Sequence, residues 1–309
     1  MINGYCIILS KFRLYQVVAL YHSLASNISD LKSFKVFILC MDHETYDILS
    51  KLNLENVLLI QLQRIETDEL RSIKKGRKLN EYCWTLKPVF LEYVLKKYLE
   101  IDRVTHLDAD LYFYGDPTSI FINQPDISIL LSDHDYSDKH KYIEDAAGKT
   151  NSGIVSFKRD KHGFKCLKWW KERCYEWCFD RVEGDKFGDQ RYLNKAPQLF
   201  KGVSYINTPG VNIAPWNEEK YKFTLKDSRV LLNKDKLIMY HFCGFRLLNK
   251  NEYTLELDWH KNPIPVIYEP YVNAILNAIT CIEKADANFN GFYKKSALGT
   301  GGKVFRLAD

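Results

Sequence analysis

Short apolar runs alternate with longer stretches that carry apolar residues at helical spacing, and this alternation constrains the fold more than any other feature. The predicted strands are 5–9, 34–39, 57–60 and 103–107, and the predicted helices are 14–25, 42–49 and 86–99. Asp42 is expected to cap the second helix, and Pro88 is expected in the first turn of the third. The order favours an α/β, Rossmann-like fold with a mainly parallel central sheet and helices on both faces.

The later part of the chain continues this pattern less regularly. Strands are predicted at 127–131, 154–157, 203–206 and 237–242, and helices at 164–179 and 271–285. Trp170 and Trp177 lie seven residues apart in the first of these helices, so they are expected on one buried face. We expect one α/β domain over residues 1–250 and a C-terminal helical extension over 251–309, which ends in a loose glycine-rich tail.

Composition and missing motifs exclude several classes of protein. The net charge of +5 is spread along the chain, and no basic run interleaves with aromatic residues, so no nucleic acid partner is expected. Neither G-x-G-x-x-G nor a Walker lysine motif occurs, which argues against a dinucleotide enzyme and a P-loop kinase. Scattered cysteines, no signal peptide and no membrane-spanning apolar run indicate a cytoplasmic protein. The basic residues near the C-terminus leave peripheral contact with the inner face of the membrane open.

The sharpest local feature is the triplet Asp108-Ala109-Asp110, which follows an apolar strand directly. Carboxylates at a buried strand end are costly unless a positive charge neutralises them. Alternate residues of an extended chain point in opposite directions, so the two acids can share a cation only if the chain turns at Ala109. With that turn, the acids could hold Mn²⁺ or Mg²⁺, and the ion could bridge a diphosphate. A helix cap or an ordinary turn is the alternative reading of the triplet alone.

The surroundings of this triplet resemble a known family. Asp108-Ala109-Asp110 is similar to the D-x-D motif of GT-A glycosyltransferases, and three later segments follow in the order typical of glycosyltransferase family 8. These segments are Asn151-Ser152-Gly153, Asp189-Gln190 with Leu193-Asn194, and His241-Phe242-Cys243-Gly244. A further segment, 209–217, is similar to bacterial sugar transferases that act on surface polysaccharides. The resemblance reaches from about the first strand to Phe245 and implies that residues 1–250 are a GT-A catalytic domain.

The resemblance implies a metal site. Asp108 and Asp110 would hold Mn²⁺ or Mg²⁺ with His241 as the third ligand, and Ala109 between the acids would contact the donor. A neutral imidazole suits such an ion. A buried, hydrogen-bonded histidine is the alternative for His241.

The resemblance also implies contacts to the donor phosphates. Gly244 stands where a family glycine lets the backbone approach the diphosphate. The family's basic residue three positions later is Leu247 here, so Arg246 is the candidate that replaces it. Thr85 and Lys87, upstream of the acids, are candidate donor contacts, and a solvated first-turn lysine is the alternative for Lys87.

Four residues are implied to face the donor sugar. Asn151 would lie close to the reacting carbon, Gly153 would leave room for the ligand, and Asp189 and Gln190 would flank the anomeric carbon. The alternatives are an ordinary turn at Asn151 and a helix cap at Asp189. We interpret the tripeptide 133–135 as part of a mobile acceptor loop rather than a second metal site, and Trp216 as structural.

The predicted reaction is transfer of a sugar from a nucleoside-diphosphate sugar, with UDP favoured, to a hydroxyl of a saccharide or lipid-linked glycan acceptor. The Asp189-Gln190 pair favours retention of the anomeric configuration, and the motifs favour bacterial surface glycan synthesis. A sugar-phosphate nucleotidyltransferase is the first alternative, although the glycine- and lysine-rich loop of that class is missing after the first strand. A non-catalytic nucleotide-sugar or glycan-binding protein is the second.

Overall fold

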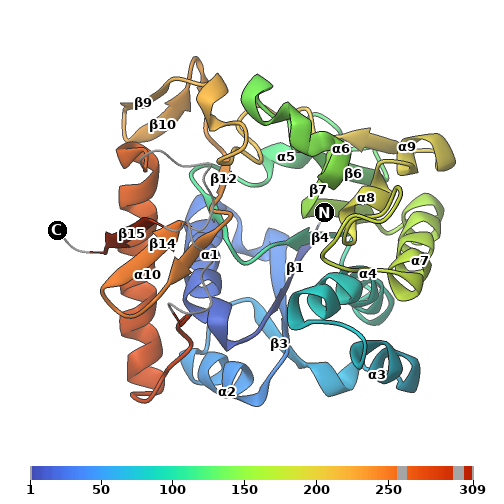
Figure 1. Cartoon of the computed structure of the whole chain (residues 1–309), viewed down its shortest axis with the longest axis horizontal. Helices are drawn as coiled ribbons and strands as arrows, with labels where there is room; N and C mark the ends of the chain where they lie inside the picture. The colour runs from blue at the N-terminus through green and yellow to red at the C-terminus, as the bar shows by residue number, and fades with distance from the viewer. Residues whose placement is uncertain (1, 256–262, 295–302, 308–309) are drawn as a thin grey trace.

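The computed structural model describes residues 2–255, 263–294 and 303–307. Its centre is a seven-stranded sheet in the order β3-β2-β1-β4-β7-β6-β8 (Figure 1). In that order the strands are Val57–Gln61, Phe34–Cys40, Asn3–Leu9, Arg103–Leu107, Thr150–Lys158, Ile129–Asp133 and Val203–Tyr205. β3, β2, β1 and β4 are parallel, whereas β7 is antiparallel to both of its neighbours. The predicted mainly parallel sheet is confirmed.

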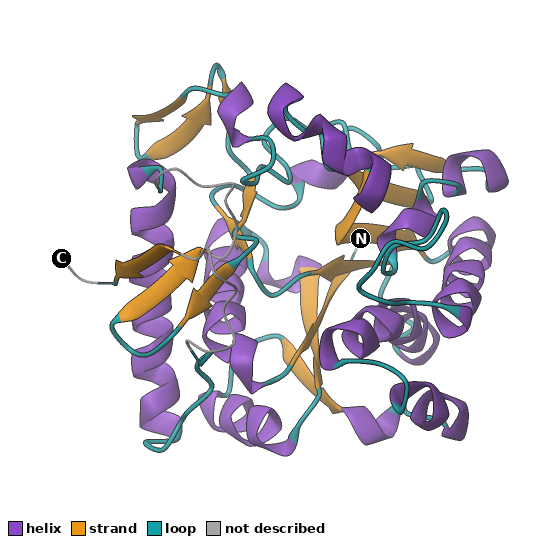
Figure 2. Ribbon diagram, viewed as in Figure 1, coloured by secondary structure: helices purple, strands orange, loops and turns teal. Residues whose placement is uncertain are grey.

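Helices lie on both sides of this sheet (Figure 2). The longer ones are α1 (Leu14–Asn27), α2 (His43–Leu52), α3 (Asp68–Lys74), α4 (Leu79–Lys97), α7 (Lys161–Glu176) and α10 (Pro265–Ala285), and the short ones are α5 (Ser119–Ile122), α6 (Glu144–Ala147), α8 (Gln190–Leu193) and α9 (Ala196–Leu199). Successive residues of a strand point to opposite faces, so β1 contributes side chains to two hydrophobic cores, one on each face of the sheet. Tyr5, Ile7 and Leu9 pack with α1 and α10, whereas Cys6 packs with α4 and α7.

Three small antiparallel sheets complete the described chain. β5 (Leu111–Phe113) pairs with β12 (Met239–His241); β9 (Phe223–Lys226), β10 (Arg229–Leu232) and β11 (Asp235–Lys236) form a second sheet; and β13 (Phe245–Leu247), β14 (Glu252–Leu255) and β15 (Lys303–Arg306) form a third. The C-terminal extension, predicted to be helical, therefore also contributes strands. Its helix α10 shares the core of α1. The domain division at residue 250 stays a prediction.

The helix predicted at 86–99 begins seven residues earlier, at Leu79, so Pro88 lies in its interior and not in its first turn. Glu81 accepts a hydrogen bond of 2.7 Å from the backbone N–H of Lys78 and caps this earlier start. The predicted start was too late because Pro88 was assigned to the first turn, where proline is best tolerated.

The helix predicted at 164–179 spans 161–176 instead. Asp160 accepts hydrogen bonds from two backbone N–H groups of the first turn and caps the start. Trp177 has an extended backbone and ends the helix, so it does not share a helix face with Trp170, although both side chains are buried.

The predicted glycine-rich tail around 299–302 lies outside the described residues. Among the helices that the structure describes, none has the length and apolar character needed to cross a membrane.

Candidate active site

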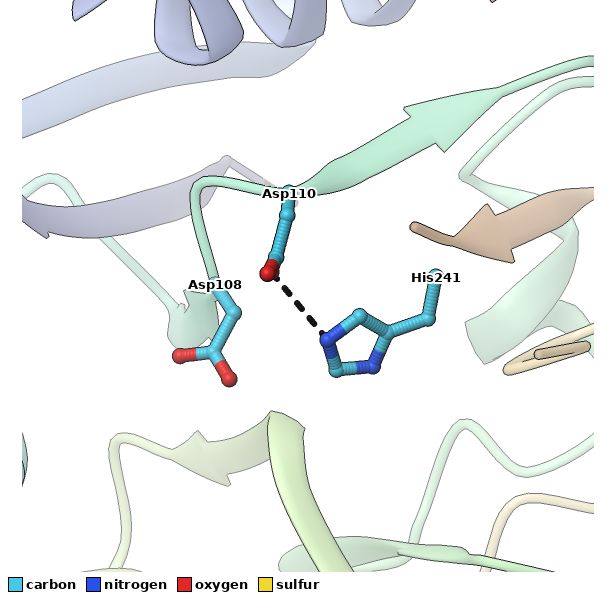
Figure 3. Close-up of side chains that lie close together, drawn as sticks. All are labelled: Asp108, Asp110 and His241. Atoms are coloured by element: carbon cyan, nitrogen blue, oxygen red, sulfur yellow. Dashed lines mark hydrogen bonds and ion pairs between the residues drawn. The ribbon is translucent and has the colours of Figure 1, made fainter. Parts of the chain in front are cut away.

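Asp108 and Asp110 lie in a turn between the end of β4 and the start of β5. The backbone N–H of Leu111 donates to the carbonyl of Asp108 over 3.3 Å, which closes the turn around Ala109. The turn predicted at Ala109 is therefore present. It brings both carboxylates toward one point, as Figure 3 shows.

His241 reaches the two acids only through tertiary structure. β12 pairs antiparallel with β5, and the register sets His241 opposite Leu111. The Nε2 atom of His241 lies 3.1 Å from Oδ1 of Asp110 (Figure 3). The indole of Trp216 packs edge-on against the imidazole at 5.2 Å between ring centres and helps to hold it in place.

This group of three side chains fits a hard divalent cation. One ligand atom from each of Asp108, Asp110 and His241 lies within 4.8 Å of the others. Ligands bound at about 2.1 Å from Mg²⁺ lie about 3.0 Å apart when adjacent and about 4.2 Å apart when opposite, so small side-chain movements would close the site. Two carboxylate oxygens and an imidazole nitrogen also suit Mn²⁺. In the described parts of the chain, this is the only such group of three potential ligands.

A buried lysine lies behind Asp108. Nζ of Lys87 is 3.0 Å from Asp108 Oδ1 and 3.7 Å from Asp189 Oδ2, and its side chain is 4% exposed. Lys87 also donates to the hydroxyl of Ser152 over 3.0 Å. Burial alone would raise the pKa of Asp108, but Lys87 and the hydrogen bond with His106 hold that pKa well below its ordinary value. Lys87 is thus a buried counter-charge and not a solvated lysine.

His106 and Asp189 complete this buried network. The sequence analysis did not single out His106, whose Nε2 lies 2.8 Å from Asp108 Oδ1. Asp189 stands at the N-cap position of α8, but its side chain makes no capping bond. Burial raises the pKa of Asp189 even though Lys87 opposes the shift. Lys87 therefore forms ion pairs with two acids that come from different parts of the chain.

Arg13 lies on the other side of the cluster, and the sequence analysis did not propose it as a site residue. Its Nη1 is 3.5 Å from Asp110 Oδ2 and 3.4 Å from the carbonyl of Phe245, and its guanidinium lies 5.8 Å from the ring centre of Tyr293. Burial alone would raise the pKa of Asp110, but His241 and Arg13 lower it below its ordinary value. A basic residue just beyond the first parallel strand was the signal that could have found Arg13.

Asn151 and Gly153 lie on β7 beside the imidazole of His241. The backbone N–H of Gly153 donates to Asn151 Oδ1 over 3.0 Å. A Cβ atom at Gly153 would lie 2.7 Å from Asn151 Oδ1 and 2.7 Å from His241 Cε1. Glycine at this position therefore makes room for the His241 ring, whereas the sequence analysis expected it to make room for a ligand.

The tripeptide 133–135 does not form an exposed loop at its centre. His134 is buried, stacks on the ring of Tyr136 at 4.6 Å, and accepts a hydrogen bond of 2.8 Å from Trp216 Nε1 through its carbonyl. Its Nε2 lies 3.2 Å from Nδ2 of Asn151, and burial lowers the pKa of His134 to about 4. His134 belongs to the packed wall beside His241, and Trp216 has the structural role expected of it.

The remaining candidates differ in how they face the site. Gln190 Nε2 donates to a backbone carbonyl of α6 over 3.0 Å. Thr85 is fully buried and its hydroxyl donates to the carbonyl of Glu81 over 2.8 Å, so the structure does not present it to a ligand. Gly244 has a φ of +84°, a conformation that favours glycine. Arg246 lies 5.0 Å from the same Tyr293 ring that Arg13 contacts.

Comparison with known proteins places the chain among relatives over most of its length. Residues 33–198 match a family model described as nucleotide-diphospho-sugar transferase. The uncharacterized protein YfnF of Bacillus subtilis is 42% identical over 302 residues, which cover 96% of this chain and 99% of the relative. YfnD of the same organism is 35% identical over 94% of each chain.

Solved structures share the fold. The galactosyltransferase LgtC, in complex with donor and acceptor sugar analogues, superposes with a TM-score of 0.56 at 15% identity, over 88% of this chain and 95% of LgtC. The glycosyltransferase GlyE of Streptococcus pneumoniae gives a TM-score of 0.52 at 15% identity, over 92% of this chain and 63% of GlyE. At this identity the likeness concerns the fold alone, and it confirms the predicted GT-A architecture.

Proposed function

The chain belongs to the nucleotide-diphospho-sugar transferase family, and on that premise we propose that it is a metal-dependent hexosyltransferase. It moves a sugar from a nucleoside-diphosphate sugar, with UDP as the favoured nucleotide, to a hydroxyl of a saccharide or lipid-linked glycan. The anomeric configuration is retained, and the product belongs to a bacterial surface glycan. The family match favours this reaction over the sugar-phosphate nucleotidyltransferase alternative.

The cluster of Asp108, Asp110 and His241 at the carboxyl edge of the parallel strands carries this proposal. A bound Mn²⁺ or Mg²⁺ would offset the negative charge that develops on the departing nucleoside diphosphate. Lys87 keeps Asp108 ionised in a buried place, so that this carboxylate is ready to act as a ligand. The site is thus preorganised by charges of the protein itself.

In this proposal, residues on one side of the cluster contact the donor phosphates and residues on the other side contact the donor sugar. Arg13 and Arg246, together with the open backbone at Gly244, lie on the side where the phosphates bind. Guanidinium groups suit phosphate because they offer several N–H donors in one plane. These two arginines take the place of the basic residue that the family carries where this chain has Leu247.

Asn151, Asp189 and Gln190 face the donor sugar in this proposal. Oδ2 of Asp189 is buried and has no hydrogen-bond partner within the described residues, which leaves it able to accept from a sugar hydroxyl. Its neighbour Gln190 holds the start of α8 against α6. The resemblance of the Asp189-Gln190 pair to retaining enzymes supports retention over inversion.

The test is the release of nucleoside diphosphate from a panel of nucleotide sugars, with Mn²⁺ and again with a chelator. We expect Asp110→Asn to lower turnover about a hundredfold or more. Asp126→Asn changes an exposed acid in the same way, so it is the matched control and should leave turnover unchanged. If turnover is unchanged both by the chelator and by Asp110→Asn, this would contradict the metal mechanism. Pyrophosphate release from a nucleoside triphosphate and a sugar phosphate would instead identify a nucleotidyltransferase.

The proposed retention of the anomeric configuration requires a separate measurement. Proton NMR of the first-formed product, recorded before the sugar can equilibrate, distinguishes the two anomers. A product with the donor's configuration supports retention, and the opposite anomer would refute it.

A further inference from the structure

The small sheet of β9, β10 and β11 lies at a corner of the molecule, at the upper left of Figure 1. Residues 220–236 contain six lysine and arginine residues and two aspartates, a net charge of +4, compared with +5 for the whole chain. The segment is therefore strongly basic for its length, as other stretches of the chain such as 71–78 also are.

Strand alternation divides the small sheet into two faces. Phe223, Val230 and Leu232 turn toward the large hydrophobic core. The cross-strand pairs Lys226–Arg229 and Leu231–Lys236 belong to the opposite face, as does Lys222 by its even spacing from Lys226. The four exposed side chains that we call the basic face are Lys222, Lys226, Arg229 and Lys236.

The basic face carries charge that its own surroundings do not neutralise. None of its four side chains forms an ion pair with a described residue, whereas the nearby Lys220 pairs with Asp135. Lys226 and Arg229 lie directly opposite each other beside the turn at 227–228. Like charges in directly opposed positions destabilise a sheet. A face that keeps such a pair is suited to meeting a negatively charged surface.

We propose that the basic face binds an anionic lipid bilayer. Its long cationic side chains are spread over a sheet and do not converge on a pocket, which suits a surface of headgroups rather than a single small anion. Leu225, on the hairpin of β9 and β10, is 63% exposed but pairs with Val230 on the opposite face, so it is not part of the basic face. This proposal goes beyond the transfer reaction and does not depend on it.

The hairpin is also tied to the active-site side of the molecule. Tyr221, just before β9, donates through its hydroxyl to Asp135 Oδ2 over 3.0 Å. Asp135 follows His134, which belongs to the wall beside His241. The segment that carries the basic face is therefore joined to the wall of the site through this hydrogen bond.

The test is co-sedimentation of the full chain with vesicles of phosphatidylcholine alone or mixed with phosphatidylglycerol. Wild-type protein should bind the mixed vesicles and not the neutral ones. A triple variant, Lys226→Gln with Arg229→Gln and Lys236→Gln, should bind about a hundredfold more weakly, at about fivefold for each charge. Because these side chains are exposed and two of them repel each other, the melting temperature should not fall.

A second triple variant with the same change in net charge is the control. Lys96→Gln, Lys168→Gln and Lys195→Gln remove exposed lysines that lie on other elements. Equal losses in the two triple variants would assign the binding to net charge and overturn the proposal. Unchanged vesicle binding in the hairpin variant would overturn it too. The proposal would also be overturned if the wild-type chain did not bind vesicles but bound soluble polyphosphate, and if the hairpin variant lost that polyphosphate binding.

Discussion

Replacing Lys87 by methionine measures how strongly a buried counter-charge supports the candidate active site. Lys87 lies 3.0 Å from Asp108 and 3.7 Å from Asp189, and its side chain is 4% exposed. Methionine fills similar space without a charge. The change leaves the buried carboxylate of Asp189 and the partly exposed carboxylate of Asp108 without their lysine, so one of them must take up a proton or attract another cation.

The expected loss follows from the burial of this network. Removing one partner of a buried ion pair costs about 3–5 kcal/mol. At about 2.1 cal/mol/K per residue, unfolding of a chain of this length has an entropy of about 0.65 kcal/mol/K, so the melting temperature should fall by about 5–8 °C. Mn²⁺ should raise the melting temperature more in Lys87→Met than in wild type, because a bound cation would replace the missing charge beside Asp108.

Differential scanning fluorimetry with and without Mn²⁺ measures both effects. Lys96→Met is the matched control, since Lys96 lies on the same helix but is 63% exposed, and it should melt within about 1 °C of wild type. If Lys87→Met also melts within about 1 °C of wild type, the charge network contributes no net stability and our reasoning about it is refuted. A loss that Mn²⁺ does not reduce would separate Lys87 from the proposed metal site.

Three further changes test other parts of the structure. Gly153→Ala should weaken Mn²⁺ binding by about tenfold to a hundredfold because the added Cβ displaces His241, while Gly76→Ala, whose Cβ would meet its nearest atom at 3.8 Å, should leave a Mn²⁺ titration unchanged. Arg13→Gln should raise the KM for the donor about tenfold or more, and an unchanged KM would remove this residue from the phosphate side. Burial raises the pKa of Glu92, but its lysine partners on α7 and α4 bring that pKa below its ordinary value. Urea titrations should therefore show Glu92→Gln less stable by about 1 kcal/mol above about pH 4.3, with the difference lost as pH falls through the lowered pKa; a pH-independent difference would contradict this assignment.

Local patterns in the sequence were sufficient for most of the central sheet. β1 and β2 contain nearly continuous apolar runs because both of their faces are buried, and such runs are visible without any partner. The start of α4 was predicted too late because Pro88 was assigned to the first turn, whereas it lies in the interior of the helix. The strands of the C-terminal extension were missed because β14 and β15 are short, and because β15 pairs with a segment far away in the chain.

The candidate site could be predicted only in part from local patterns in the sequence. Asp108 and Asp110 could be found from their spacing and from the strand that precedes them. Lys87 was a candidate donor contact, but its ion pair with Asp108 could not be predicted, because only the folded chain brings α4 beside that acid. Arg13 was missed, although its position just after β1 was a usable signal. Gly153 was identified, but its contact with His241 was not, since that ring belongs to a residue far along the chain.

The sequence by itself determined the alternating strand–helix order and the pair of acids at a strand end, because both depend on residues that are neighbours in the chain. Tertiary structure alone decided that His241 stands beside Asp110. The antiparallel pairing of β12 with β5 sets that position, and the backbone N–H of Phe242 donates to the carbonyl of Asp110 over 2.8 Å. Backbone hydrogen bonds between distant strands set register, and no spacing of side chains along the chain encodes that register.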